Sequence, residues 1–269
     1  GPEHFAIVER PVMQLYGAAL RQLGPLPEAW ERLWPGLPEA GQPGEPAFDS
    51  LPVPQQDAVN RVYVTILKCL AAYERRVVSG QAPFDRFVAG DTTALSATAQ
   101  RGFQHFLRLR CDTCHTTPLF SDDQFHNLGL PAVPVPDYGR AAGLQHLERS
   151  VWRATGPYAD GPALVRTDDS PPGTALEGSF RTPSLRELAS TGPYGHNGTI
   201  ASLEAWLEHY VAVTTAPAEA RIGTLDPALE PLELTLQEKQ ELVEFLLSLS
   251  SPYASEWTQP PALAGGAPD

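Results

Sequence analysis

Apolar residues recur with the spacing of a helix face in several separate stretches of this 269-residue chain. Residues three and four positions apart share one face of an α-helix, so the pattern predicts an amphipathic helix wherever it persists. The predicted helices cover residues 12–23, 55–78, 97–109, 202–211 and 235–249. Ser96 stands where the N-cap of the third helix is expected. No stretch shows the clear alternation of a half-buried strand, so a mostly α chain is predicted.

Proline and glycine dominate the segments between these helices. The chain contains 28 prolines and 22 glycines, which interrupt helices and favour turns. Residues 24–54 are expected to be mostly coil, and residues 131–180 an elaborated loop without a clear period. The predicted fold class is therefore mostly α, with long irregular loops and an N-terminal helical extension.

Acidic side chains outnumber basic ones, and the formal net charge is −13 at pH 7. Such a chain repels nucleic acids and anionic membrane surfaces, so neither is an expected partner. A cationic redox protein would be attracted, although an acidic surface also serves solubility alone. The sequence contains no run of about 18 apolar residues, so no transmembrane span is predicted.

The motif that carries chemistry is Cys111-Asp112-Thr113-Cys114-His115. Cys-x-x-Cys-His is the spacing of covalent c-type haem attachment. Two thiols on one turn can reach the two vinyl groups of one porphyrin, and the adjacent imidazole can then bind the iron. We therefore expect one covalently bound haem c per chain, held by Cys111 and Cys114, with His115 as an axial ligand.

Two other interpretations of this motif fit the sequence less well. A thioredoxin-like redox pair follows a strand, whereas a helical pattern precedes Cys111. A structural zinc site needs a second Cys/His pair, and none has the required spacing. The third cysteine, Cys69, lies in an apolar helical run, where a free thiol is expected to pack as a small hydrophobic residue.

Segments spread along the chain resemble the second haem domain of bacterial dihaem cytochrome c peroxidases and MauG-type enzymes. They are residues 70–76, 83–87, 90–91, 100–102, 114–127, 180–186, 191–198 and the helix at 236–249. Members of this family have two cytochrome c domains, each with its own Cys-x-x-Cys-His, whereas this chain has one such motif. The resemblance thus implies the C-terminal haem domain, with the N-terminal domain that carries the peroxidatic haem absent from this chain.

The same resemblance divides the chain into a cytochrome c-like haem domain at residues 91–252, a helical and Pro/Gly-rich linking region at residues 1–90, and a C-terminal tail at residues 253–269. Bacterial c-type cytochromes acquire haem outside the cytoplasm, which implies a periplasmic or exported protein. The first four residues lack the basic start and apolar core of a signal peptide, so we expect a mature, trimmed or partial chain.

The second iron ligand is implied to lie on the helix after Gly198, where peroxidases carry Met and MauG-type enzymes carry Tyr. This position is Tyr210, and the only methionine, Met13, lies far before the haem motif. His209 is the alternative ligand, but adjacent helical residues point about 100° apart, so only one of the two can face the iron. An ordinary half-buried tyrosine is the other interpretation of Tyr210.

Further roles are implied by the resemblance alone. Arg181 would pair with a haem propionate through its guanidinium group. The backbone carbonyls of Thr191 and Pro193 match positions that help to bind calcium. Glu3 is the candidate for the family's distal catalytic glutamate. One position departs from the MauG pattern, because Leu109 stands where those enzymes carry a relay tryptophan, and the resemblance therefore does not imply tryptophylquinone formation.

These observations lead to a functional hypothesis. The chain would be the electron-transfer haem domain of a peroxidase or MauG-like oxidoreductase, exchanging single electrons with a peroxidatic haem that uses hydrogen peroxide. Expected partners are a second haem domain or haem subunit, and a small redox protein, such as a cytochrome or cupredoxin, or a protein substrate. The alternatives are a stand-alone monohaem electron-transfer cytochrome without peroxidase activity, or a scaffold that keeps only the fold.

Overall fold

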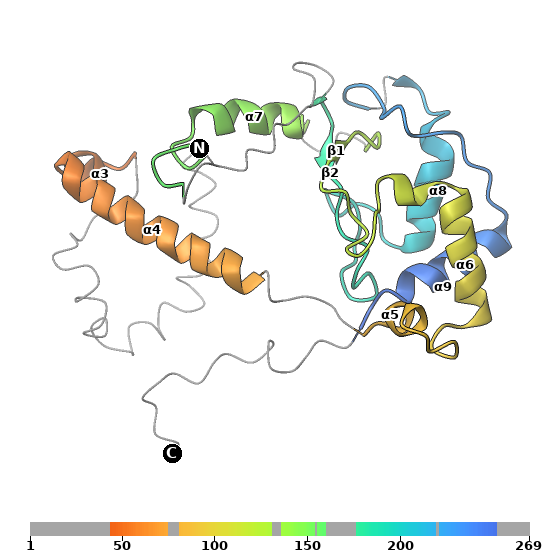
Figure 1. Ribbon diagram of the computed structural model, residues 1–269. Helices are drawn as coiled ribbons and strands as arrows, with labels where there is room; N and C mark the ends of the chain where they lie inside the picture. The colour runs from red at the N-terminus through yellow and green to blue at the C-terminus, as the bar shows by residue number, and fades with distance from the viewer. Residues whose placement is uncertain are drawn as a thin grey trace, which may run out of the picture. The chain divides into compact units, whose positions relative to one another are not determined.

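The computed structural model describes residues 44–74, 81–130, 136–153, 155–159, 176–218 and 221–251 (Figure 1). The chain divides into two compact units, Gly1–Arg76 and Val77–Asp269. The helix predicted at residues 12–23 lies outside the described residues. The domain boundaries expected at residues 90 and 252 stay a prediction. None of the described helices is long and apolar enough to cross a membrane.

The described part of the first unit consists of α3 (Pro46–Asp49) and α4 (Val53–Glu74). Proline opens α3, where its missing N–H costs no hydrogen bond, and the Phe48 ring is buried. Along α4, the ion pair between Asp57 and Arg61 joins neighbouring turns at 2.8 Å. The long helix predicted at residues 55–78 is thus confirmed as far as Glu74.

The second unit holds the haem motif and most of the regular structure. It contains α5 (Pro83–Val88), α6 (Ala97–Arg108), the 3-10 turn η1 (Cys111–Thr113), β1 (Phe125–His126), α7 (Arg140–Arg149), β2 (Phe180–Arg181), α8 (Leu203–Val213) and α9 (Leu236–Leu247). The two short strands pair antiparallel, with Phe125 opposite Arg181 and His126 opposite Phe180. The mostly α fold class is confirmed (Figure 1).

Three helices of this unit begin at capping residues that the sequence contains. Ser96 before α6, Ser202 before α8 and Thr235 before α9 each accept a hydrogen bond from the backbone N–H three residues later. Thr235 and Glu238 also form a reciprocal capping box. Because these side chains satisfy N–H groups that a helix leaves unpaired, they define where each helix starts.

Besides the single-turn helix α3 in the segment expected to be mostly coil, two helices of the second unit depart from the sequence predictions. Residues 131–180 were expected to form a loop without helices, but α7 occupies residues 140–149. Its leucines, Leu144 and Leu147, do not form a continuous apolar face, so the helical period was not recognisable. The other missed helix, α5, has only six residues, too few for a period. It starts with Pro83 and is capped by Asp85, whose carboxylate accepts the N–H of Ala82 at 3.1 Å.

The core of the second unit is an aromatic cluster between α5, α6 and α9. Its rings belong to Phe84, Phe103, Phe106, Phe120 and Phe245, and neighbouring ring centroids lie 5.1–6.2 Å apart. Most pairs meet edge to face, the arrangement that the ring quadrupoles favour. Phe120 lies five residues after His115, so this cluster anchors the segment that follows the haem motif.

The closest approach of α6 and α9 depends on Gly102. A Cβ atom at this position would lie 1.9 Å from the backbone oxygen of Glu241 and 2.8 Å from Cβ of Phe245. Only glycine leaves room for the backbone of α9 here, because the nearest atom is a backbone carbonyl oxygen and not the flexible end of a side chain. The packing of α6 against α9 therefore explains the glycine in the Gln100-Arg101-Gly102 segment.

A buried carboxylate joins the same two helices. Glu241 of α9 accepts hydrogen bonds from Arg101 Nε at 2.6 Å and from His105 Nε2 at 2.8 Å, both on α6. Gln237 adds a third bond at 3.0 Å. Hydrogen bonds from Gln237, Arg101 and His105 lower the pKa of Glu241 from its ordinary 4.5 to about 2. The folded protein thus favours the ionised carboxylate.

We expect this carboxylate to make stability depend on pH in the acid range. Because its folded pKa lies below its unfolded value, the stabilisation is present above about pH 4.5 and is lost as the pH falls towards 2. The Glu241→Gln variant should lose less stability over that window, as measured by urea unfolding at several pH values. Glu244→Gln, on the exposed side of α9, is the control and should keep the full acid dependence. An unchanged pH slope in Glu241→Gln would contradict this prediction.

Candidate haem-binding site

The haem motif occupies the turn that follows α6. Arg110 ends the helix with a left-handed backbone conformation, φ 59°, and η1 then carries Cys111 to Thr113. The backbone N–H of His115 donates to the carbonyl of Cys111 at 3.0 Å, which closes the turn. Both motif cysteines are half-buried free thiols. Burial, with the charge of Asp112 next, raises the pKa of Cys111 to about 12, so this thiol is neutral at pH 7.

The imidazole of His115 is oriented by one hydrogen bond. Its Nδ1 donates to the backbone oxygen of Phe120 at 2.8 Å. The pKa of His115 is lowered, mainly by burial of the ring, so the imidazole is neutral at pH 7. With the proton on Nδ1, the lone pair of Nε2 is available to a metal. The ring orientation therefore follows from Phe120, whose side chain is fixed in the aromatic core.

Tyr210 lies on α8 with its phenol close to the motif. Burial raises the pKa of Tyr210, and the interaction with Cys111 and then with Cys114 adds to the shift. The Trp206 ring lies one turn earlier and meets Tyr210 edge to face, with centroids 5.6 Å apart. The structure thus brings Tyr210 together with the haem motif, about a hundred residues away in sequence.

His209, the alternative ligand, is engaged elsewhere. Its Nε2 donates to the backbone oxygen of Leu128 at 2.7 Å, and its ring stacks on Trp206 with centroids 5.2 Å apart. The two neighbouring residues of α8 therefore have different surroundings, as the helical geometry requires. This arrangement favours Tyr210 over His209 as an iron ligand.

Asn127 connects the segments around the site. Its side chain is almost fully buried and donates from Nδ2 to the backbone oxygens of Glu177 at 2.8 Å and Ile222 at 2.7 Å. Its Oδ1 accepts the N–H of Gly129 at 2.8 Å. One amide thus joins three chain segments by satisfying their backbone groups, which explains the asparagine after Phe125-His126.

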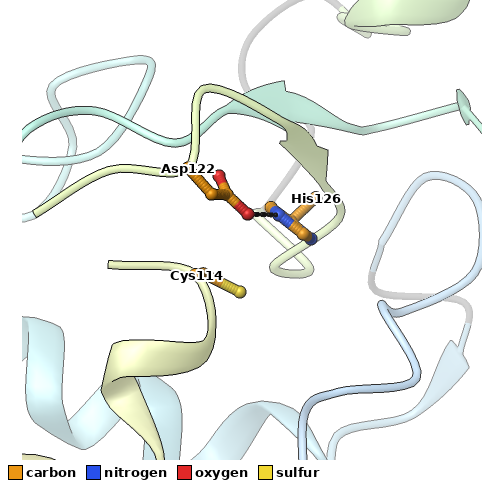
Figure 2. A group of neighbouring side chains, drawn as sticks. All are labelled: Cys114, Asp122 and His126. Atoms are coloured by element: carbon orange, nitrogen blue, oxygen red, sulfur yellow. Dashed lines mark hydrogen bonds and ion pairs between the residues drawn. The ribbon is translucent and has the colours of Figure 1, made fainter. Parts of the chain in front are cut away.

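His126 is the residue whose importance sequence reasoning missed. Its Nε2 donates to Asp122 Oδ2 at 2.9 Å and its Nδ1 to Asp226 Oδ2 at 2.7 Å. Figure 2 shows the Asp122 carboxylate directed at the imidazole, with the sulfur of Cys114 pointing into the same space. A hydrogen bond with Cys114, followed by those with Asp226 and Asp122, raises the pKa of His126 to about 10. Only Asp122 is near His126 in sequence, so the pattern offered no signal for the cluster.

The remaining predicted site residues lie in three places. Arg181, on β2, pairs with Asp123 and keeps 63% of its side chain exposed, so its guanidinium is accessible to a further anion. Thr191 donates from its hydroxyl to the Glu187 carbonyl at 3.1 Å, and Pro193 follows it in the same turn. The calcium assignment stays a prediction. Glu3 lies outside the described residues.

Comparison with known proteins identifies the relationship. Cytochrome-c peroxidase IdrP1 of Denitromonas iodatirespirans is 44% identical over 192 residues, which cover 67% of this chain. Methylamine utilization protein MauG of Methylorubrum extorquens is 37% identical over 188 residues, 69% of this chain. The chain belongs to the cytochrome c peroxidase and MauG-like family. The resemblance inferred from the motifs is thereby confirmed, although no protein-family model matches the chain.

The relationship has a defined extent. The matches cover 48% of IdrP1 and 44% of MauG, so the chain spans about half the length of the curated relatives it matches. Among solved structures, a MauG-like protein associated with microbial copper homeostasis superposes with a TM-score of 0.51. That match covers 79% of this chain and 61% of the other at 23% identity, which supports the shared fold.

Proposed function

We propose that this chain is a c-type haem electron-transfer domain of a cytochrome c peroxidase or MauG-like oxidoreductase. In the complete enzyme it would exchange single electrons with a peroxidatic haem that uses hydrogen peroxide. The observation that carries the proposal is the combination of Cys111, Cys114 and His115 on one turn with the half-buried Tyr210 of α8, whose pKa responds to both cysteines. Family membership supports the class of oxidoreductase.

The side chains of this turn fit a covalently bound haem. The two cysteines are free and half-buried, so neither thiol is already committed to another bond. His115 is held as the neutral tautomer with Nε2 available for iron, because Phe120 takes the Nδ1 proton in a 2.8 Å hydrogen bond. Haem, when bound, would supply one-electron chemistry at its iron. Arg181 would contribute an exposed guanidinium for a propionate.

Tyr210 and His115 would be the two protein ligands of the iron. Its raised pKa means that burial disfavours the bare phenolate, so the proton leaves only when a cation compensates the charge. Ferric iron does so better than ferrous iron, because an anionic oxygen ligand stabilises the higher oxidation state. A tyrosine ligand therefore lowers the reduction potential, which suits the storage of oxidising equivalents.

Substitution of Tyr210 should change the haem in two distinguishable ways. Tyr210→Met should raise the reduction potential, because a thioether favours ferrous iron. Tyr210→Phe should remove the sixth ligand, so that cyanide or azide binds to ferric iron much faster than in the parent protein. Potentiometric titration and optical spectra measure both effects.

Two variants serve as controls for this experiment. Tyr138→Phe changes a tyrosine that is 49% exposed and should leave the potential and ligand binding unchanged. His209→Gln should also keep the parent spectrum, because His209 is bonded to the Leu128 carbonyl. If His209→Gln alters the iron spectrum while both Tyr210 variants do not, His209 is the ligand.

The proposal also includes a location and partners. Covalent haem attachment implies a periplasmic or exported protein, and the net charge of −13 favours a cationic redox protein such as a cytochrome or cupredoxin. The other proposed partners are a second haem domain or haem subunit, and a protein substrate. Calcium bound by the carbonyls of Thr191 and Pro193 would add an oxygen-ligated cation to the loop before α8.

We expect the haem-loaded chain by itself to be a poor peroxidase. With His115 and Tyr210 both bound to iron, peroxide has no open coordination position. Stopped-flow mixing with stoichiometric peroxide should show a low-spin ferric spectrum that changes slowly. The change should become faster when an N-terminal haem domain is supplied. A slow reaction that no added haem domain accelerates would favour the stand-alone cytochrome. Fast consumption of peroxide by the single chain would assign the active site here and contradict the prediction.

A further inference from the structure

We propose that the chain, before haem is attached, binds one zinc ion through Cys114, Asp122 and His126. We further infer that this zinc site and haem attachment at Cys114 exclude each other. The exclusion rests on the proposed function, whereas the metal site rests on geometry alone. The site would hold the haem-free chain in a metal-bound form that must release zinc before haem loading.

The donor atoms are already gathered. Within the described part of the chain, the Cys114 sulfur, a carboxylate oxygen of Asp122 and an imidazole nitrogen of His126 all lie within 4.8 Å of one another (Figure 2). Zinc bonds of about 2.0–2.3 Å separate the donors of a tetrahedron by about 3.3–3.8 Å. Side-chain movements of about 1 Å would therefore close the site around an ion.

The type of donor selects the metal. Sulfur, nitrogen and carboxylate oxygen together suit a borderline-soft divalent cation, and zinc accepts all three. Calcium and magnesium prefer oxygen ligands alone, so they fit this set poorly. Three protein ligands leave a fourth position for water, and each of the three residues is half-buried, so solvent can reach the ion.

The residues behind the donors strengthen the case. Asp226 binds Nδ1 of His126 at 2.7 Å, which orients the ring with Nε2 towards Asp122. The backbone N–H of Gln124 binds Asp122 Oδ1 at 2.9 Å and leaves Oδ2 for the shared position. A carboxylate on the far nitrogen of a ligating histidine is the usual support of a zinc site. Zinc would replace the proton that Nε2 and Asp122 now share.

Haem attachment removes one of these donors. In thioether formation the S–H of Cys114 adds across a vinyl C=C bond, with a new C–S bond and a new C–H bond, and no oxidant is required. The resulting sulfur is neutral and carries a carbon substituent, so it no longer offers a thiolate to zinc. Conversely, a zinc-bound Cys114 cannot react with the vinyl group until the metal leaves.

The test uses the full chain, produced without haem attachment and kept reduced, with Co²⁺ as a coloured probe that Zn²⁺ then displaces. We expect one cobalt per chain and a thiolate-to-cobalt charge-transfer band. Cys114→Ser should remove the band, and His126→Gln should weaken binding at least tenfold. Asp226→Asn, which keeps all three donors, should weaken binding by about 10- to 100-fold.

The matched control is Cys111→Ser, which changes the other cysteine of the same turn and should keep the band. Loss of binding in Cys111→Ser equal to that in Cys114→Ser would show a simple two-thiol site and overturn the proposal. So would unaltered binding in both His126→Gln and Asp226→Asn, or the absence of one-to-one binding in a chain whose circular dichroism shows it folded.

A second measurement separates this inference from the proposed function. The haem-loaded chain should give no thiolate-to-cobalt band, and excess Zn²⁺ should slow covalent haem attachment to the haem-free chain. A full cobalt band in covalently loaded protein would overturn the exclusion. If haem proves to be non-covalent, the proposed function fails, while the cobalt titration of the haem-free chain still decides the metal site.

Discussion

Replacing Cys111 and Cys114 together with alanine should abolish covalent haem. The two sulfurs are the only groups of the motif that can form thioethers, and both are free in the fold. In cells that carry out c-type haem attachment, the parent chain should migrate with its haem absorbance under denaturing conditions, and its mass should rise by one haem. The double variant should show neither effect. Each single variant should retain one thioether.

Cys69→Ala is the control for this experiment. The sequence places Cys69 outside the Cys-x-x-Cys-His motif, so its replacement should leave one covalent haem per chain. Haem that leaves the unmutated chain on denaturation would contradict the assignment of the motif. Equal loss of covalent haem in Cys69→Ala would show that the yield reports folding and not thioether chemistry.

Gly102→Ala should destabilise the second unit by about 3 kcal/mol, the upper part of the usual cost of overpacking a core. The added methyl group would lie 1.9 Å from a backbone oxygen of α9, so α6 and α9 must separate before it fits. Separation also disturbs the Phe103 and Phe245 contact, where the ring centroids lie 5.2 Å apart. Urea unfolding followed by circular dichroism measures the loss.

Gly143→Ala provides a matched control on α7. Its Cβ would meet nothing within 4 Å, so alanine there should be neutral or stabilise by up to about 1 kcal/mol through its higher helix propensity. Equal stability of the two variants would show that α6 and α9 can move apart freely. Because α6 leads directly into η1, Gly102→Ala should also lower the yield of attached haem.

The helices that matter most for the site were recognisable from neighbouring residues. Ser96, Ser202 and Thr235 mark starts that the structure confirms for α6, α8 and α9. Caps and apolar periods act over a few residues, so their signal is local. The helices α5 and α7 lacked such signals, the first through its length and the second through its polar surface, and they were missed.

By itself, the sequence predicted the attachment chemistry, because Cys111, Cys114 and His115 lie within five residues and one turn suffices to align them. Other features depended on the path of the whole chain. Only the tertiary structure brings Tyr210 near the motif and His209 into a hydrogen bond with the Leu128 carbonyl. It also brings Asp226 into a hydrogen bond with His126, 100 residues away in sequence. Short-range geometry is encoded in spacing, whereas contacts between distant segments follow from packing, which local patterns do not contain.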